Sequence, residues 1–430
     1  MKKTITILGV LAILGMQQIQ AQTRLSLSLQ EAQQYAVEHN AAMQNAELDV
    51  KKAELDRWKT LSAMLPSVKA GFDYQNMCGY KMEMNMGGGS ISIPMDPTGT
   101  LSVTASMAVN GAMIVGTMLQ DLALEMSDIN RQQTEQQTRS NVKNSYVSIL
   151  IMEQTAGLLD SSLANMQRLA ATSQASVDVG AAEQVDADKL QVQVATLQSS
   201  INTTRRSLQM LRNSLLLQLG ADVDAELVLT TPVEQILDVD NALSVLSESF
   251  NMKNNYSYQL LEKNEELAKQ QVNMAWMDFS PTLSAYYQFS KKYHYGDKGM
   301  DMTPPNMVGF SLSVPLLTSG TRYAGVKSAK IALQETQNSR RQAEDGLRVQ
   351  YNQLRYDLSS ALETYDIQRR NLDVTQRVFA NVTEKYKYGR ASSLEVTTAS
   401  TDIITAQSNY IQAVMNVISA QVALENLLNN

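Results

Sequence analysis

The stretch Tyr386–Val396, YKYGRASSLEV, places a glycine between two long runs of helix-forming residues. A related stretch, VDVGAAEQVDA at Val177–Ala187, lies in the first half of the chain, and a shift of 209 residues aligns the two glycines. A glycine directly after a helical run is typical of the left-handed residue that ends a helix. Ser392 with Glu395 three residues later is the pattern of a capping box, which starts a helix. Each stretch therefore predicts the tip of a helical hairpin.

The repeat extends beyond the hairpins. Residues 44–75 align with residues 259–290 at a shift of 215, and Pro66 then coincides with Pro281. We expect two structural repeats, residues 22–240 and 241–430, each with the order helix–strand–strand–helix–helix.

Apolar residues follow both hairpins in alternating steps of four and three, which is typical of left-handed supercoiled helices. These positions are Leu190, Val194, Leu197, Ile201, Thr204, Leu208, Leu211 and Leu215, and Ala399, Ile403, Ala406, Tyr410, Ala413, Val417, Ala420 and Leu424.

One predicted helix is unusually long. No proline occurs from about residue 113 to residue 177, and such a helix would approach ~100 Å at ~1.5 Å per residue. A globular domain cannot bury a helix of that length, so we expect a thin, extended bundle. The faces away from the apolar seam carry mostly uncharged polar residues, which suit contact with water or with a wide aqueous lumen.

Four segments alternate apolar and polar residues, at about 67–77, 101–110, 282–290 and 307–317. Strict alternation predicts strands with one apolar face, and about ten residues is the length of a tilted strand that crosses a bilayer. The alternative is an ordinary sheet of two hairpins packed on helices. Four strands cannot close a barrel, which needs roughly eight, and lipid tolerates no open sheet edge. We therefore expect an oligomer that pools strands, such as a trimer with twelve.

Composition and the N-terminus restrict the location. The 430 residues carry a net charge of −7 and no marked basic patch, which argues against a nucleic-acid partner. Residues 1–21, with Lys2 and Lys3 before an apolar run at 5–16, predict a secretory signal peptide. The alternative, a membrane anchor, needs a longer apolar run. Cys78 is the single cysteine, so the chain cannot form an internal disulfide.

The sequence contains no enzyme motif. Its two histidines, His39 and His294, lack partners at ligand spacing, and no P-loop, GxSxG or HExxH occurs. We expect a helix-end residue and a loop residue, no catalytic site, no cofactor and no dedicated metal site. A methionine-rich loop near Cys78 (Met77, Met82, Met84, Met86 and Met95) has ligands that suit Cu(I). The alternative is a flexible surface loop in a chain of 23 methionines.

The order of these features over residues 22–430 resembles the TolC-like outer-membrane efflux protein family. The paired hairpins carry the resemblance, together with NGAMIVG at Asn110–Gly116 and SVPLLTSG at Ser313–Gly320. It implies a homotrimer with a twelve-stranded transmembrane β-barrel in outer-membrane lipid and a tunnel of long α-helical hairpins in the periplasm. It also implies a passive exit duct in tripartite efflux or type I secretion. The partners would be a periplasmic adaptor protein and an inner-membrane pump of RND or ABC type.

The resemblance also implies a periplasmic gate. Carried over by position, the gate residues are Asp186, Tyr386, Glu395 and Thr398, and the adaptor-contacting tips are Gly180 and Gly389. Thr398 stands where the family has an acidic residue, and Ala391 where it has an arginine. For Glu395 the capping role is an alternative or additional reading, and for Tyr386 the alternative is packing. A different class of function stays open too, a secreted structural protein built of long helical hairpins. The sequence does not indicate the transported substrate.

Overall fold

The computed structural model describes residues 24–87, 89–296 and 304–429, so the predicted signal peptide at 1–21 lies outside the described residues. The chain divides into two compact units. The helical unit comprises Met1–Asn45, Gln133–Asn255 and Leu347–Asn430, and the sheet unit comprises Ala46–Gln132 and Tyr256–Gly346. Each unit therefore combines segments from both predicted repeats.

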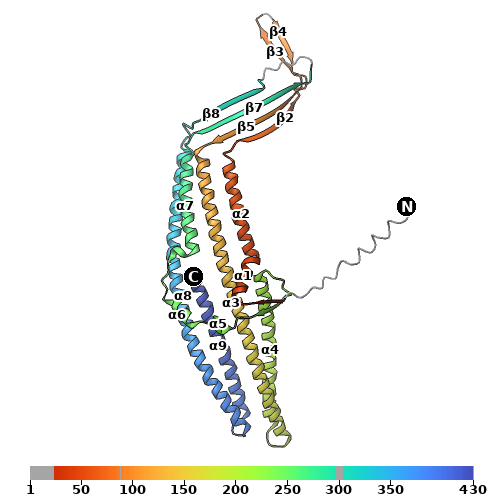
Figure 1. Ribbon diagram of the computed structural model, residues 1–430, viewed down its shortest axis with the longest axis vertical. Helices are drawn as coiled ribbons and strands as arrows, with labels where there is room; N and C mark the ends of the chain where they lie inside the picture. Colours follow the sequence, from red (N-terminus) through yellow and green to blue (C-terminus); the bar gives the residue numbers. More distant parts are fainter. Residues whose placement is uncertain (1–23, 88, 297–303, 430) are drawn as a thin grey trace, which may run out of the picture. The chain divides into compact units, whose positions relative to one another are not determined.

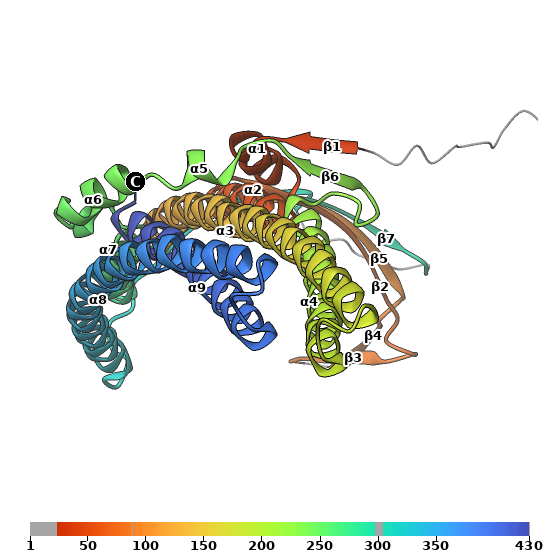
Figure 2. The same ribbon diagram turned by 90° about the horizontal axis from the view of Figure 1, so that it is seen from below.

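The helical unit is built from long helices and a small parallel β-pair. Helices α3 (Gly111–Asp178) and α8 (Thr321–Lys387) contribute their C-terminal parts, and α4 (Gln184–Leu219) and α9 (Ser393–Leu428) lie entirely within it. Strands β1 (Arg24–Leu27) and β6 (Glu226–Leu229) lie side by side (Figure 2). The shorter elements are α1 (Leu29–His39), α5 (Val233–Ile236), α6 (Val239–Ser247) and a 3₁₀ turn at Met252–Asn254.

The predicted 3.5-residue seams form the core of the helical unit. Leu190, Leu197 and Ile201 of α4 are buried against Leu163 and Met166 of α3. Helix α9 has a second buried face as well. Its predicted seam packs on α8 through Val417 and Leu424, whereas Ile411, Val414, Ile418 and Val422 pack on α3. With two apolar faces, α9 is long and apolar enough to cross a membrane, but 56% of its most apolar stretch is buried inside the protein.

Tyr146 fixes the small β-pair to the helices. Its ring is fully buried, its hydroxyl donates to the Leu27 carbonyl at 3.0 Å, and the same oxygen accepts from the Thr231 amide at 2.9 Å. The predicted capping box at the start of α1 is present, because Ser28 and Glu31 bond each other's backbone amides. These contacts satisfy polar groups that would otherwise be costly to bury.

The sheet unit contains an antiparallel sheet of four strands in the order β2-β5-β7-β8 (Figure 1). The strands correspond to the four predicted segments, at Ser67–Gln75, Thr98–Val109, Thr282–His294 and Asn306–Ser313. Strand β8 ends earlier than expected, because Pro315 has no amide to donate to a ladder. His294 is the last residue of β7 rather than a loop residue. Helices α2 (Ala41–Ser62) and α7 (Tyr256–Met277) precede the two hairpins of the sheet.

The predicted methionine-rich loop contains a hairpin that the alternation did not identify. Strand β3 (Lys81–Met86) pairs with β4 (Gly89–Pro94), and Met82 lies opposite Ile93 and Met84 opposite Ile91. The glycines that made this segment look like a loop belong to its turn. Met82 and Met84 therefore share one face of a short, exposed hairpin.

The register of the four-stranded sheet places most of its apolar side chains on one face, although Lys291 lies on that face opposite Leu101. Val103 pairs with Ala70 on one side and Phe289 on the other, and Tyr287 pairs with Ala105 and Val308. All four alternating patterns thus place their apolar residues on the same face. This face is not covered by any described part of the protein: its exposed large side chains include Val68, Phe72, Tyr74, Leu283, Tyr287, Val308, Phe310 and Leu312.

A buried carboxylate joins the helices of the sheet unit. Glu265 of α7 is 4% exposed, and its oxygens lie 2.8 Å from Lys269 Nζ and 2.8 Å from Arg340 Nη1 of α8. Gln337 Nε2 also donates to it at 3.2 Å. These contacts, with that of Lys269 the largest, hold the pKa of Glu265 below its ordinary value although burial alone would raise it.

Candidate gate at the helical hairpin tips

Both predicted tip glycines adopt the left-handed conformation that ends a helix. Gly180 has φ +72° and Gly389 has φ +67°. The same two hydrogen bonds close each end. Ala181 N donates to the Ser176 carbonyl at 2.7 Å and Arg390 N to the Lys385 carbonyl at 2.9 Å, while the two glycine amides donate to the carbonyls of Val177 and Tyr386, both at 2.9 Å. This Schellman arrangement satisfies the last carbonyls of α3 and α8. The prediction of two equivalent helix ends is confirmed.

Glu395 acts as a helix cap. Its Oε2 accepts from the Ser392 amide at 2.7 Å, and Ser392 Oγ accepts from the Glu395 amide at 3.2 Å. Both halves of the predicted capping box are therefore present at the start of α9. The carboxylate stays exposed to solvent, so its charge remains available beside the turn. The matching helix α4 starts at Glu183 without a side-chain cap.

Asp186 joins the two hairpins. Its Oδ1 accepts a hydrogen bond from the hydroxyl of Ser393, the first residue of α9. Ser393 is only 2% exposed, and Lys189 Nζ lies 3.9 Å from the same carboxylate oxygen. Sequence reasoning missed Ser393, because the repeat aligns Asp186 with Glu395 and gives no signal for a contact between the repeats.

The other two candidate residues differ in their surroundings. Tyr386 is half-buried and packs against an apolar cluster to which Val396 of α9 also belongs, so the packing alternative describes its ring. Thr398 is exposed, and no hydrogen bond joins it to the other three candidates among the described residues. The structure thus joins Asp186 to the start of α9 through Ser393, and Thr398 lies one helical turn after Glu395 on the same helix. The cluster is Leu159, Leu163, Met166, Leu169, Ala170, Leu190, Leu197, Ile201 and Val396.

A cavity of about 690 Å³ lies next to Tyr386 between α3 and α8. Apolar side chains line part of it, including Leu169 and Phe379, and polar and charged side chains line the rest. Thr383 also lines it, and its buried hydroxyl has no hydrogen-bond partner among the described residues.

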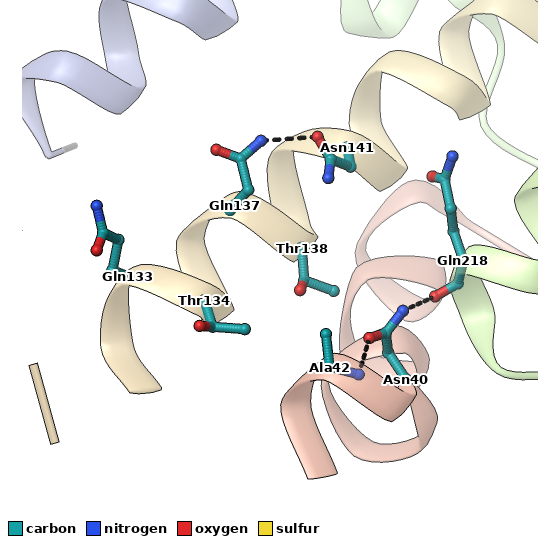
Figure 3. A pocket seen from close by; sticks show the side chains of 8 residues that line it. All are labelled: Asn40, Ala42, Gln133, Thr134, Gln137, Thr138, Asn141 and Gln218. Atoms are coloured by element: carbon teal, nitrogen blue, oxygen red, sulfur yellow. Dashed lines mark hydrogen bonds between the residues drawn. The ribbon is translucent and has the colours of Figure 1, made fainter. Parts of the chain in front are cut away.

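A second hollow lies where α1 turns into α2. Asn40 spans this turn, because its Nδ2 donates to the Gln218 carbonyl at 2.6 Å and its Oδ1 accepts from the Ala42 amide at 2.7 Å (Figure 3). The lining is uncharged, and Gln137 donates to Asn141 at 2.8 Å on the opposite wall. The hollow of about 370 Å³ is lined by Asn40, Ala42, Gln133, Thr134, Gln137, Thr138, Asn141 and Gln218. Within the described ranges, no group of three or more His, Cys, Asp or Glu residues could hold a metal ion.

Residues 235–430 match the family model described as Outer membrane efflux protein. This segment makes up a little less than half of the chain, so it is the second half that is similar to the outer membrane efflux proteins. This confirms the resemblance drawn from the hairpins and the strand order. Proteins with these descriptions are channels rather than enzymes, and the family localises to the outer membrane.

Individual relatives of the chain are distant. The outer membrane efflux protein BepC of Brucella suis biovar 1 (strain 1330) is 22% identical over 307 residues, which cover 69% of this chain but only 64% of BepC. Among solved structures, the outer membrane protein VceC of Vibrio cholerae is 14% identical with a TM-score of 0.74, and the match covers 94% of this chain and 96% of VceC. The open-state outer membrane channel MtrE of Neisseria gonorrhoeae is 15% identical with a TM-score of 0.75, covering 94% and 89%. These structures establish the mainly helical fold with its four-stranded sheet.

Proposed function

We propose that this chain is the outer-membrane channel component of a tripartite efflux or type I secretion system. In this role it is a passive exit duct for substrates that an inner-membrane pump delivers. The chain itself needs no catalytic residue, because the pump supplies the energy. The proposal goes beyond the similarity to outer membrane efflux proteins, which by itself identifies neither the partners nor the substrate.

One observation carries the proposal. The four-stranded sheet exposes a continuous apolar face, and its outer strands β2 and β8 have a partner on one side only among the described residues. In water such a face and such edges would favour aggregation. In a bilayer the apolar face is solvated by lipid, whereas open edges are forbidden. Both requirements are met when β8 of one copy pairs with β2 of the next.

Three copies would close a barrel of twelve strands, which is the trimer of the proposal. Aromatic side chains at both ends of the apolar face support its position in a membrane. Tyr74 and Tyr295 contact each other at one end, with ring centroids 5.8 Å apart, and Trp276 and Phe279 do so near the other, also at 5.8 Å. Such girdles are typical of transmembrane barrels.

The gate belongs to the proposal as well. We assign it to Asp186, Tyr386, Glu395 and Thr398, with Gly180 and Gly389 at the tips that would contact a periplasmic adaptor. The hydrogen bond from Ser393 to Asp186 supports a contact that holds the two hairpins of one copy in a fixed arrangement. A ring of Asp186 and Glu395 carboxylates in the trimer would attract cations.

The test has a biochemical and an electrical part. Unheated samples from the outer-membrane fraction should migrate as a trimer and boiled samples as a monomer, and the purified trimer should form pores in planar bilayers. A soluble monomer without pore activity would overturn the proposal and would favour the secreted structural protein instead. No observation on this chain favours that alternative over a channel.

A further inference from the structure

Three cations gather on the first turns of α8 in the sheet unit. Arg322, Lys327 and Lys330 follow one another without an intervening carboxylate, and the next acidic residue along the chain is Glu335. None of the three forms an ion pair with a carboxylate in the part of the chain that the structure describes. Cations near a helix N-terminus also oppose the helix dipole. These cations are therefore free of ion pairs within the described part of the chain and can meet an external anion.

Each of these cations lies over an aromatic ring. Arg322 Cζ is 5.9 Å from the ring centre of Phe279, Lys330 Nζ is 5.7 Å from that of Trp276, and Lys327 Nζ is 5.0 Å from that of Tyr323. Trp276 and Phe279 stand at the end of α7, which runs beside this part of α8 (Figure 1). All three rings are exposed. The pairs hold the cations at the surface, where a larger anionic group can reach them.

The most exposed apolar side chains of the described chain lie next to this patch in sequence. Leu316 and Leu317 are 90% and 91% exposed, and they join the end of β8 to the start of α8. Two leucines, exposed aromatic rings and unpaired cations within a few residues are the combination that suits a membrane interface. The leucines would contact the acyl chains of a phospholipid, the aromatic rings its glycerol region, and the cations its phosphate.

We infer that Arg322, Lys327 and Lys330, with Trp276, Phe279 and Tyr323, form a binding surface for anionic phospholipid headgroups. The inference rests on the proposed function, because the barrel must lie in a bilayer for α8 to meet its periplasmic leaflet. Charge complementarity decides the occupant: a neutral zwitterionic headgroup cannot compensate three cations, whereas phosphatidylglycerol carries a net negative charge. The surface would fix the height and tilt of the channel at the inner edge of the membrane.

Tryptophan fluorescence gives a direct test. The chain has two tryptophans, so the Trp58→Phe variant leaves Trp276 as the reporter beside Lys330. The purified trimer is titrated with short-chain phosphatidylglycerol or short-chain phosphatidylcholine, both below their micelle concentrations. We expect a saturable response to phosphatidylglycerol that is tighter by at least about tenfold, and that weakens when salt screens the cations.

The variant Arg322→Gln/Lys327→Gln/Lys330→Gln should lose this preference. Its affinity for phosphatidylglycerol should fall by about fivefold for each cation removed. The control Arg341→Gln/Arg348→Gln/Arg369→Gln removes the same charge from other positions on α8 and should behave as the parent. Equal affinity for both lipids, an unchanged triple variant, or equal competition by inorganic phosphate would overturn the inference. So would a shift from trimer to monomer in the triple variant, because the surface would then bind a second copy. Pore conductance, measured in parallel, shows separately whether the proposed channel function stands.

Discussion

Ser393 at the first residue of α9 donates a hydrogen bond to the carboxylate of Asp186 in the first turn of α4. The bond joins two helical hairpins that are 207 residues apart in sequence. A half-buried anion held by a buried hydroxyl is a specific contact, and removing one partner leaves the other unsatisfied. The tips of the helical unit are therefore connected as well as similar.

We expect Asp186→Ala and Ser393→Ala each to raise single-channel conductance, because each releases one hairpin from the other. The double variant should add little, with a coupling energy of about 1 kcal/mol in the thermal stability of the trimer. Planar-bilayer recording and thermal unfolding measure the two effects. Asp188→Ala is the control, since Asp188 bonds only within α4, to Gln184. Fully additive effects would show that the bond does not couple the hairpins.

Tyr386 should respond differently from Asp186. Its ring packs on the apolar cluster of α3, α4 and α9, so Tyr386→Phe keeps the packing and should leave conductance and stability near those of the parent. Tyr386→Ala should raise conductance and cost about 2 kcal/mol, because it removes a half-buried ring. If Tyr386→Phe alone opens the pore, the hydroxyl rather than the packing closes it.

Gly389→Ala tests the helix end. At φ +67° a side chain other than glycine is strained, and the variant should lose about 1 kcal/mol of stability. Gly157→Ala is the matched comparison: this glycine lies inside α3 with open space where a Cβ would stand, so alanine should stabilise by about 0.5 kcal/mol. Thermal unfolding of the two variants should shift in opposite directions. The same sign for both would contradict the left-handed assignment.

Phe310 and Ser311 test which face of the sheet meets lipid. Phe310 is 79% exposed on the apolar face, and Ser311, its neighbour in β8, points to the other face. Phe310→Arg should reduce assembled trimer in the outer membrane, because a charge on the lipid face costs about 2–4 kcal/mol near the bilayer centre. Ser311→Arg should assemble normally. Heat-modifiable migration of outer-membrane fractions gives the readout, and equal assembly of both would speak against a lipid-facing sheet.

The buried Glu265 makes the sheet unit sensitive to acid. The contacts with Lys269, and with Gln337 and Arg340, hold the pKa of Glu265 in the folded protein below its ordinary value. The carboxylate therefore contributes stability that is fully present above the unfolded pKa and is lost as pH falls through the folded pKa. Glu265→Gln should cost about 3 kcal/mol at neutral pH, and the difference from the parent should shrink in acid. Amide hydrogen exchange of α7 across that range measures it, with the exposed Glu335→Gln as control. A pH-independent difference would refute the ionic origin.

Much of this architecture is encoded locally. The 3.5-residue apolar period predicted the buried seams of α4 and α9, strict alternation predicted the four strands of the sheet, and YKYGRASSLEV predicted both the left-handed Gly389 and the capping box of Ser392 and Glu395. These features depend on neighbours within one turn or one strand, so they are visible in sequence. The hairpin β3–β4 was missed because its glycines and methionines outweighed a short alternation.

Tertiary structure decided what joins segments distant in the chain. No sequence pattern paired Asp186 with Ser393, buried Glu265 between Lys269 and Arg340, or gave α9 its second buried face against α3. Such contacts depend on how helices meet, and the energy of a buried ion pair or hydroxyl exists only once both partners are desolvated together. The sequence thus determined the elements, their periodic faces and their ends. Packing alone decided which polar groups those faces bring into contact.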